Sequence, residues 1–148
     1  MIYSDTSALT SILYHRVYSR CINDSLKELK KPLILWNFGE VELGCALKAM
    51  MRDPQTKLSD YQRKEILQKL AILVNLGKVI ISRNINVDLV MELAKTMIER
   101  PHFNSRSLDT IHVASAKVLD ATYFMSTDHN QRNLAQSEGL TVIPYKLS

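Results

Sequence analysis

The sequence contains little glycine and proline, with four of each among 148 residues. All-β proteins use these residues in their many turns, so such low numbers favour a fold with long helices. The length fits a single domain spanning residues 1–148. A hydrophobic fraction of 46% and a charged fraction of 23% are typical of a globular protein with a buried core.

Cysteine is scarce as well. Cys21 and Cys45 form no Cys-x-x-Cys or Cys/His pattern, so the sequence does not indicate a zinc site. We expect two free thiols in a reducing compartment. The first residues lack the basic segment and apolar run of a signal peptide, and no apolar run approaches the roughly 20 residues that cross a bilayer. We therefore expect a cytoplasmic protein without a membrane partner.

Positive charge is only slightly in excess. Lys and Arg outnumber Asp and Glu by 19 to 15, which gives a formal net charge of +4. This permits a polyanionic partner such as nucleic acid, but many basic proteins of this size bind none. The basic residues are scattered, unlike the long runs of disordered nucleic-acid-binding tails. Charge alone therefore does not decide the function.

Hydrophobic periodicity and capping residues predict strands and helices in alternation. The expected strands span residues 2–5, 33–36, 79–81, 122–125 and 140–143. The expected helices span residues 8–14 (with Thr6 or Ser7 as the cap), 17–29, 40–51, 59–76, 87–99, 107–119 (with Ser107 as the cap) and 130–137, and residues 102–106 form a polar loop. This order predicts an α/β fold, with a central parallel sheet of about four or five strands and helices on both faces.

Three acids fall where such a fold binds its ligands, beyond the carboxyl ends of the strands. Asp5 ends the first expected strand, Asp128 follows the strand at 122–125, and Asp109 lies in the first turn of a helix. Each has an ordinary structural explanation as well. Asp109 would favour the helix dipole, Asp128 could cap the next helix, and Asp5 could belong to a turn. Their coincidence at one edge of one sheet favours a shared site.

A fourth acid would come from the helix expected at residues 40–51. Glu40 and Glu42 are two residues apart, so they point about 200° from one another and at most one faces the site. Periodicity leaves the choice between them open. Clustered carboxylates repel one another unless a cation lies among them. Ligands that are all oxygen favour magnesium or manganese, ions that can activate water near a phosphate.

Four segments, taken in order, resemble the motifs of PIN-domain ribonucleases, and in particular the VapC-like toxins of type II toxin–antitoxin systems. They are MIYSDTSAL at residues 1–9, ELGCAL at 42–47, SLDTIHVASA at 107–116 and FMSTD at 124–128. The resemblance runs along almost the whole chain. It implies a PIN-like fold and a metal-dependent endoribonuclease that uses Mg²⁺ or Mn²⁺ to hydrolyse RNA phosphodiester bonds.

The resemblance also implies which residues form the site. It assigns catalysis and metal binding to four carboxylates, those of Asp5, Glu42, Asp109 and Asp128, and so selects Glu42 over Glu40. Ser7 and Thr127 fall where the family has hydroxyl groups near the site. His112 shares a helix face with Asp109, and we expect it to support the site or to be a satisfied core histidine rather than a metal ligand.

For partners, the resemblance implies an RNA substrate, a homodimer formed through helices early in the chain, and a small cognate antitoxin, encoded beside this protein, with a segment that covers the acidic cleft. Proximity in sequence to the acids suggests four phosphate-contacting residues, Arg16, Arg20, Lys48 and Arg52. Residues 104–106 lie where a substrate loop could be, and residues 54–86 match no motif.

The main alternative is a nuclease-inactive PIN fold that acts as an RNA- or protein-binding module, although all four acids are present. Phosphotransfer folds fit less well. A dehalogenase-type phosphatase requires an acid where Ser7 stands, and a receiver domain requires an acidic pair where Asp5 is followed by Thr6.

Overall fold

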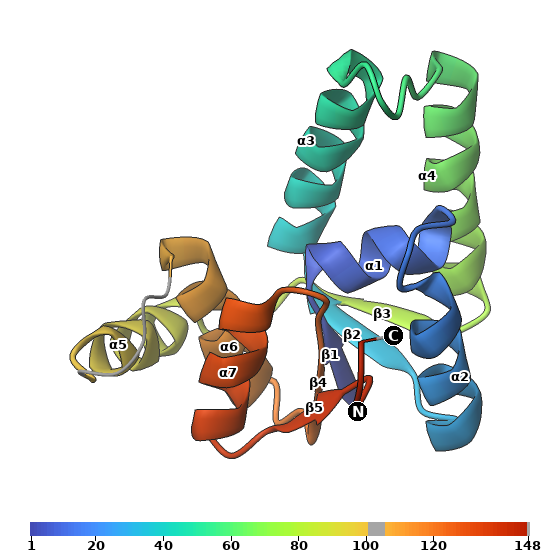
Figure 1. The fold of residues 1–148 in the computed structure, drawn as a ribbon. Helices are drawn as coiled ribbons and strands as arrows, with labels where there is room; N and C mark the ends of the chain where they lie inside the picture. The colour runs from blue at the N-terminus through green and yellow to red at the C-terminus, as the bar shows by residue number, and fades with distance from the viewer. Residues whose placement is uncertain (101–105, 148) are drawn as a thin grey trace.

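A computed structural model describes residues 1–100 and 106–147 and shows five strands in one parallel sheet (Figure 1). The strand order is β3-β2-β1-β4-β5. The strands are β1 (Ile2–Ser4), β2 (Leu33–Trp36), β3 (Val79–Ser82), β4 (Tyr123–Met125) and β5 (Thr141–Ile143). The fold class expected from the sequence is therefore confirmed.

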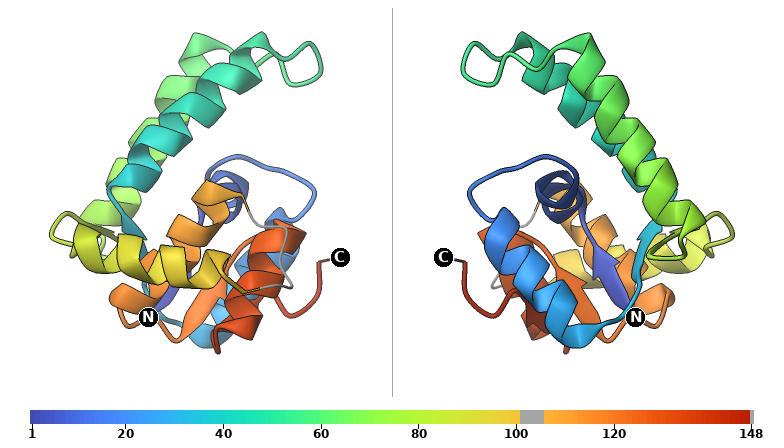
Figure 2. Two further views of the ribbon diagram at one scale, coloured as in Figure 1. Left: turned by 90° about the vertical axis from the view of Figure 1, so that its left-hand side faces the viewer. Right: turned by 90° about the vertical axis from the view of Figure 1, so that its right-hand side faces the viewer.

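Seven helices in the described residues connect and cover the strands. They are α1 (Thr6–Leu13), α2 (Ser19–Leu29), α3 (Phe38–Arg52), α4 (Asp60–Asn75), α5 (Val87–Ile98), α6 (Ser107–Val118) and α7 (His129–Ser137). The first four lie on one face of the sheet and the last three on the other (Figure 1). The far ends of α3 and α4 extend beyond the rest of the molecule (Figure 2).

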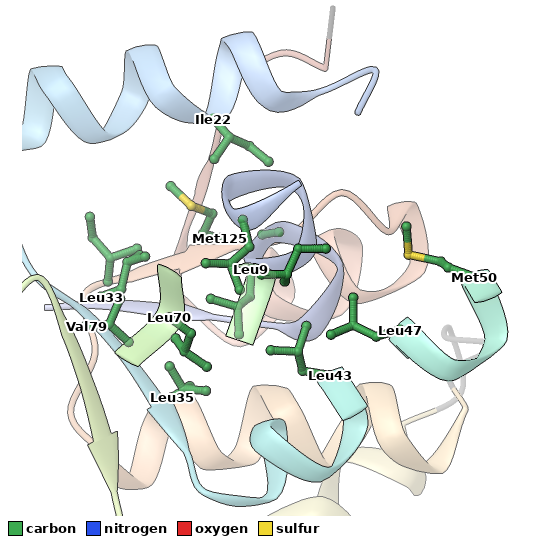
Figure 3. Close-up of a cluster of buried hydrophobic side chains, with 14 of the residues drawn as sticks. Leu9, Ile22, Leu33, Leu35, Leu43, Leu47, Met50, Leu70, Val79 and Met125 are labelled. Carbon is green, nitrogen blue, oxygen red and sulfur yellow. The ribbon is translucent and has the colours of Figure 1, made fainter. Parts of the chain in front are cut away.

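Both faces of the sheet are buried, and alternate strand residues point into different cores. Leu33 and Leu35 belong to the core beneath α1–α4, whereas Ile34 belongs to the core beneath α5–α7. The first of these cores is shown in Figure 3, where side chains from α1, α2, α3 and α4 meet those of β2, β3 and β4. This two-residue alternation within continuous apolar runs is what a parallel sheet covered on both sides requires.

Most predicted elements differ from the observed ones by one or two residues at an end, and the prediction for residues 33–36 is confirmed. The capping box at Ser59 and Gln62 is also confirmed at the start of α4. The expected loop at residues 102–106 lies outside the described residues apart from Arg106.

Two predicted helix caps are wrong. The cap of α1 is Asp5 and not Thr6 or Ser7, because its carboxylate directly follows β1 and accepts the backbone N–H of Ala8 at 2.8 Å. In α6, Ser107 is the first helical residue and Arg106 occupies the cap position, where its backbone N–H donates to Asp109 at 3.2 Å.

The strand order creates a topological switch point between β1 and β4. The chain leaves β1 for α1 on one face of the sheet and leaves β4 for α7 on the other face. In open parallel sheets, the crevice for ligands forms at this point, beyond the carboxyl ends of the two strands. None of the described helices is long and apolar enough to span a membrane.

Helix α3, which lies beside this crevice, packs against the sheet through one buried face. Leu43 is fully buried in the core beneath α1–α4, whereas Val41 on the same helix is 61% exposed. We expect Leu43→Ala to lower the free energy of unfolding by about 2–5 kcal/mol, because it leaves a cavity. The matched control Val41→Ala should change it by less than about 0.5 kcal/mol. Urea denaturation of both variants measures the difference, and equal effects would contradict this packing.

Candidate functional site

Asp5 lies at the switch point itself. It follows the last residue of β1, and its backbone N–H donates to the carbonyl of Met125 at the end of β4. The pairing of Ser4 with Met125 brings the segments that leave the two strands side by side. The topology therefore places Asp5 next to Ser126, which is 121 residues away in the sequence.

The Asp5 carboxylate is only 1% exposed and has several hydrogen-bond donors. It accepts from the backbone of Ala8 at 2.8 Å, from the Ser7 hydroxyl at 2.8 and 2.9 Å, and from the Ser126 hydroxyl at 2.6 Å. Burial raises the pKa of Asp5, although His112 and these donors act in the opposite direction. The site thus holds a carboxylate whose negative charge is only partly compensated.

Ser126 connects Asp5 to Asp128. Its hydroxyl donates to Asp5 and accepts the backbone N–H of Asp128 at 3.0 Å. Asp128 in turn caps α7, because its carboxylate accepts the backbone N–H groups of Asn130 at 2.8 Å and Gln131 at 3.0 Å. The possible capping role of Asp128 is therefore confirmed, and this role places it one serine away from Asp5.

Ser7 and Thr127 join the same two segments. The Ser7 hydroxyl accepts the backbone N–H of Thr127 at 3.1 Å and lies 2.9 Å from the Thr127 hydroxyl. Both residues thus lie beside Asp5, in the part of the molecule where the resemblance expected hydroxyl groups. The direct contact of Thr127 is with Ser7 rather than with a carboxylate.

Gln131 connects Asp128 to Asp109. Its backbone N–H donates to Asp128, and its side-chain amide donates to Asp109 at 3.0 Å. Asp109 is 7% exposed and lies in the first turn of α6. Within the described residues, the buried amide oxygen of Gln131 has no hydrogen-bond partner. A buried acceptor of this kind can receive a hydrogen bond from a water molecule or a ligand.

Glu42 enters the site from α3. Its carboxylate accepts the Thr6 hydroxyl at 2.8 Å and lies 2.6 Å from the Nε2 atom of His112. Burial works against the charge of Glu42, but His112 and Thr6 outweigh it and lower the pKa of Glu42. Glu40, by contrast, pairs with Arg83 at 3.4 Å, so only one of the two glutamates faces the site.

His112 uses both ring nitrogens within the protein. Its Nδ1 atom lies 2.9 Å from the Tyr3 hydroxyl, and its Nε2 atom contacts Glu42. The side chain is buried beneath β1, with Tyr3 and Phe38 against its ring. This arrangement orients Glu42 and leaves neither nitrogen open for a metal ion.

The four acidic residues are thus connected to one another through intermediate side-chain and backbone groups. Asp5, Asp128 and Asp109 are linked through Ser126 and Gln131, and Glu42 joins through Thr6 next to Asp5 and through His112 on α6. In residues 1–100 and 106–147, no group of three or more His, Cys, Asp or Glu side chains is placed to hold a metal ion. Metal binding by the four acids therefore stays a prediction.

The donor set nevertheless suits a hard cation. It consists of carboxylates, hydroxyls and an amide oxygen, which are ligands preferred by Mg²⁺ and Mn²⁺. A cation would also relieve the partly compensated charge of Asp5. The buried amide oxygen of Gln131, which has no partner among the described residues, is a further oxygen acceptor beside the acids. The residues present therefore fit the ion that the sequence suggested.

A cleft of about 430 Å³ adjoins the acids. It lies between α1, the loop that follows α1, and α3, with Thr6, Ser7 and Thr127 on its wall. Of the four basic residues suggested as phosphate contacts, Arg16 lines this cleft, whereas Arg20, Lys48 and Arg52 are exposed residues outside it. The site therefore opens toward the loop after α1.

Sequence reasoning missed Ser126 and Gln131, the two side chains that connect the acids. Ser126 stands between β4 and Asp128, and Gln131 lies in the first turn of α7. The available signal was a polar residue at a strand end and another in the first turn of a helix. Such residues are common in loops and caps, so the signal does not distinguish them from surface residues.

The raised pKa of Asp5 predicts how stability depends on pH in the metal-free protein. The folded-state pKa lies above the unfolded value of about 3.9, so wild type loses stability as pH rises through the interval between them. Asp5→Asn carries no charge and avoids this loss. In the presence of a chelator, the free energy of unfolding of Asp5→Asn relative to that of wild type should increase between pH 4 and pH 8. The total increase is about 1.4 kcal/mol for each unit by which the folded-state pKa of Asp5 exceeds the unfolded value.

Urea unfolding at several pH values measures this difference. The exposed residue Asp24 on α2 provides a matched control, and Asp24→Asn should show no comparable increase. A stability difference for Asp5→Asn that shrinks toward pH 8 would contradict the inferred burial of charge.

Comparisons with known proteins find the same fold. No protein-family model matches the sequence, and no curated protein matches it at a significant level. FitAcB from Neisseria gonorrhoeae is 16% identical, covers 96% of both chains and has a TM-score of 0.64. VapC20 from Mycobacterium tuberculosis, a sarcin-ricin loop cleaving toxin, is 12% identical, covers 95% of this chain and 97% of that chain, and has a TM-score of 0.63.

A third solved structure is VapBC2 from Rickettsia felis, bound to a DNA fragment from their promoter. It is 14% identical, covers 96% of this chain and 97% of that chain, and has a TM-score of 0.61. At such identities the likeness establishes the fold. The chain therefore has the PIN-like α/β fold of these proteins, and the acids connected at its β1–β4 switch point lie beyond the carboxyl ends of the strands.

Proposed function

We propose that the protein is a metal-dependent endoribonuclease of the PIN-domain class and the toxin of a toxin–antitoxin pair. The observation that carries this proposal is the chain of hydrogen bonds that links Asp5, Asp128 and Asp109 at the switch point, with Glu42 beside it. The fold supports the same interpretation, because VapC20, which shares it, is a toxin that cleaves the sarcin-ricin loop.

In this proposal the carboxylates of Asp5, Glu42, Asp109 and Asp128 would hold Mg²⁺ or Mn²⁺. Such an ion would supply an activated water and neutralise charge on the departing oxygen. The protein supplies the positioning. Ser7 and Ser126 hold Asp5, Gln131 holds Asp109, and His112 keeps Glu42 oriented and favours its charged form.

The proposed reaction is hydrolysis of a phosphodiester bond. Water attacks the phosphorus in line and a carboxylate of the site accepts its proton. The bond between phosphorus and the 3′ oxygen breaks, and that oxygen takes up a proton. The products carry a 5′-phosphate and a 3′-hydroxyl. Because water rather than the ribose 2′-hydroxyl attacks, the chemistry does not itself require RNA, and selection of RNA must come from substrate binding.

Substitution of the acids tests the proposal. We expect Asp5→Asn and Asp109→Asn to lower RNA cleavage at least about 100-fold, because each removes a carboxylate from the site while leaving a similar shape. The exposed control Asp24→Asn should cleave like wild type. Chelator should stop the wild-type reaction, and added magnesium or manganese should restore it. End-mapping of the RNA products gives the readout.

Full activity of purified Asp5→Asn would refute the proposed site. The alternative, a nuclease-inactive module, predicts instead that wild type binds single-stranded RNA but leaves it intact at every metal concentration. Titration of wild type with magnesium or manganese in the presence of RNA therefore distinguishes a nuclease from an inactive binding module.

The partner would be an antitoxin encoded beside this protein. The proposal draws on VapBC2, which has the same fold and is bound to a fragment of promoter DNA. Formation of a homodimer stays a prediction. Coverage of the acidic cleft by a segment of the antitoxin likewise stays a prediction. A second surface suited to this partner lies at the opposite edge of the sheet from the acids, where β2 and β3 begin.

This surface is a groove of about 770 Å³ between α2 and α4. Its apolar floor includes Leu26, Leu33 and Leu73, and no acidic residue of the described chain lines it. Five lysines surround the floor: Lys27, Lys30, Lys31, Lys69 and Lys78. An apolar floor with a basic rim is complementary to an amphipathic segment that carries acidic residues.

Charge reversal in the groove tests the partner proposal. We expect Lys78→Glu to weaken binding of the protein encoded by the adjacent short reading frame by about tenfold, the effect of roughly 1.4 kcal/mol. Lys95→Glu, an exposed change on α5, is the control. Co-purification followed by titration measures both affinities. Equal affinities for the two variants would place the partner elsewhere.

A further inference from the structure

The cleft beside the acids has an unusual concentration of hydroxyl groups along α1. The residues at the first, second, fifth and sixth positions of this helix share one face, and all line the cleft: Thr6, Ser7, Thr10 and Ser11. The opposite rim is formed by Arg16 and Tyr18 of the following loop and by Ala46 of α3. The volume of the cleft lies within the range of pockets that hold small ligands.

Each of these four hydroxyls already donates its proton within the protein. Thr6 donates to Glu42 and Ser7 donates to Asp5. Thr10 donates to the backbone carbonyl of Thr6 at 2.7 Å, and Ser11 donates to the backbone carbonyl of Ser7 at 3.0 Å. A hydroxyl has one proton but two acceptor positions. Thr127 occupies both acceptor positions of Ser7 with its backbone N–H and its hydroxyl. The hydroxyl oxygens that remain as acceptors on this wall belong to Thr6, Thr10 and Ser11, and a ligand that binds them must supply the proton.

Nucleic acid can supply such a donor from the amino and imino groups of its bases or, in RNA alone, from the ribose 2′-hydroxyl. Phosphate oxygens are acceptors at neutral pH, and deoxyribose has no donor at its 2′ carbon. A ribose 2′-hydroxyl can donate, and it is the group by which a protein distinguishes RNA from DNA. Arg16, the one charged side chain among the described residues lining the cleft, has only donors and suits the acceptor-only phosphate.

We infer that this cleft is the subsite for a ribonucleotide next to the scissile bond. In it, the hydroxyl oxygen of Thr10 or of Ser11 accepts the one hydrogen bond that the ribose 2′-hydroxyl can donate, and Arg16 binds the adjoining phosphate. The inference rests on the proposed nuclease function and adds to it the source of RNA selectivity. Thr10 and Ser11 touch none of the four acids, so they can be changed without removing a ligand of the proposed ion.

The test combines protein and substrate changes. Wild type, Thr10→Val, Ser11→Ala and the double variant are compared on an RNA oligonucleotide and on versions with one 2′-deoxynucleotide at each position flanking the mapped cut. One deoxynucleotide should lower the wild-type kcat/KM by about 2- to 12-fold, the value of one net hydrogen bond. The double variant should lose the same factor on RNA and lose nothing further on the deoxy substrate.

Matched controls guard against a change of fold. Thr10→Ser keeps the hydroxyl and should retain the discrimination. Thr96→Val removes the same type of bond on α5, where Thr96 donates to the carbonyl of Glu92, and should behave as wild type. Arg16→Ala should raise KM equally on both substrates and flatten the salt dependence, whereas Arg20→Ala should not.

Binding in chelator separates the outcomes. Without cleavage, wild type should bind RNA more tightly than the matching DNA, and the double variant should bind both alike. If wild type cuts RNA but every variant shows the same loss on the deoxy substrate, the ribose is read elsewhere and the inference is wrong while the nuclease proposal stands. If wild type binds RNA with this preference but never cuts it, the nuclease proposal fails and the subsite stands.

Discussion

The burial of one negative charge governs the architecture of the site. Asp5 has almost no access to water, so its carboxylate depends on the donors that the fold places around it. Ala8 and Ser7 come from the helix that Asp5 itself begins, whereas Ser126 comes from the far end of the sequence. The arrangement therefore exists only when β1 and β4 are paired. Folding of the sheet and assembly of the site are the same event.

The structural and functional explanations of the acids turn out to be compatible. Asp5 caps α1, Asp128 caps α7, and Asp109 accepts a backbone N–H in the first turn of α6. Three helix N-termini thus converge on one crevice, and each carries partial positive charge toward it. Backbone donors fix the orientation of each carboxylate and offset part of the mutual repulsion. The fold positions these acids by using them as helix caps. An acid that caps a helix can therefore also take part in binding.

The sequence predicts the fold better than it predicts the connections within the site. Buried strands such as residues 33–36 are recognisable because both faces are apolar, and Asp128 is recognisable because it follows a strand. The choice of Glu42 over Glu40 depended on the resemblance, since helical spacing shows only that one of them faces away. Ser126 and Gln131 could not be found, because their significance arises from contacts made by the folded chain. Local sequence patterns do not indicate which distant residues will form hydrogen bonds with each other.

The hydrogen bonds also indicate how the acids could change partners when a cation binds. Backbone donors are fixed by the helices, so the oxygen of Asp5 that accepts from Ala8 is committed to α1. Its other oxygen accepts from the hydroxyls of Ser7 and Ser126, whose protons can rotate to other acceptors. At Asp128, both backbone N–H groups of α7 bind one and the same oxygen. Asp5 and Asp128 therefore each keep one oxygen anchored to a helix, while a rotation of hydroxyl protons suffices to free the second oxygen of Asp5. Binding of an ion would then require local adjustment of side chains, with the helices and the sheet left in place.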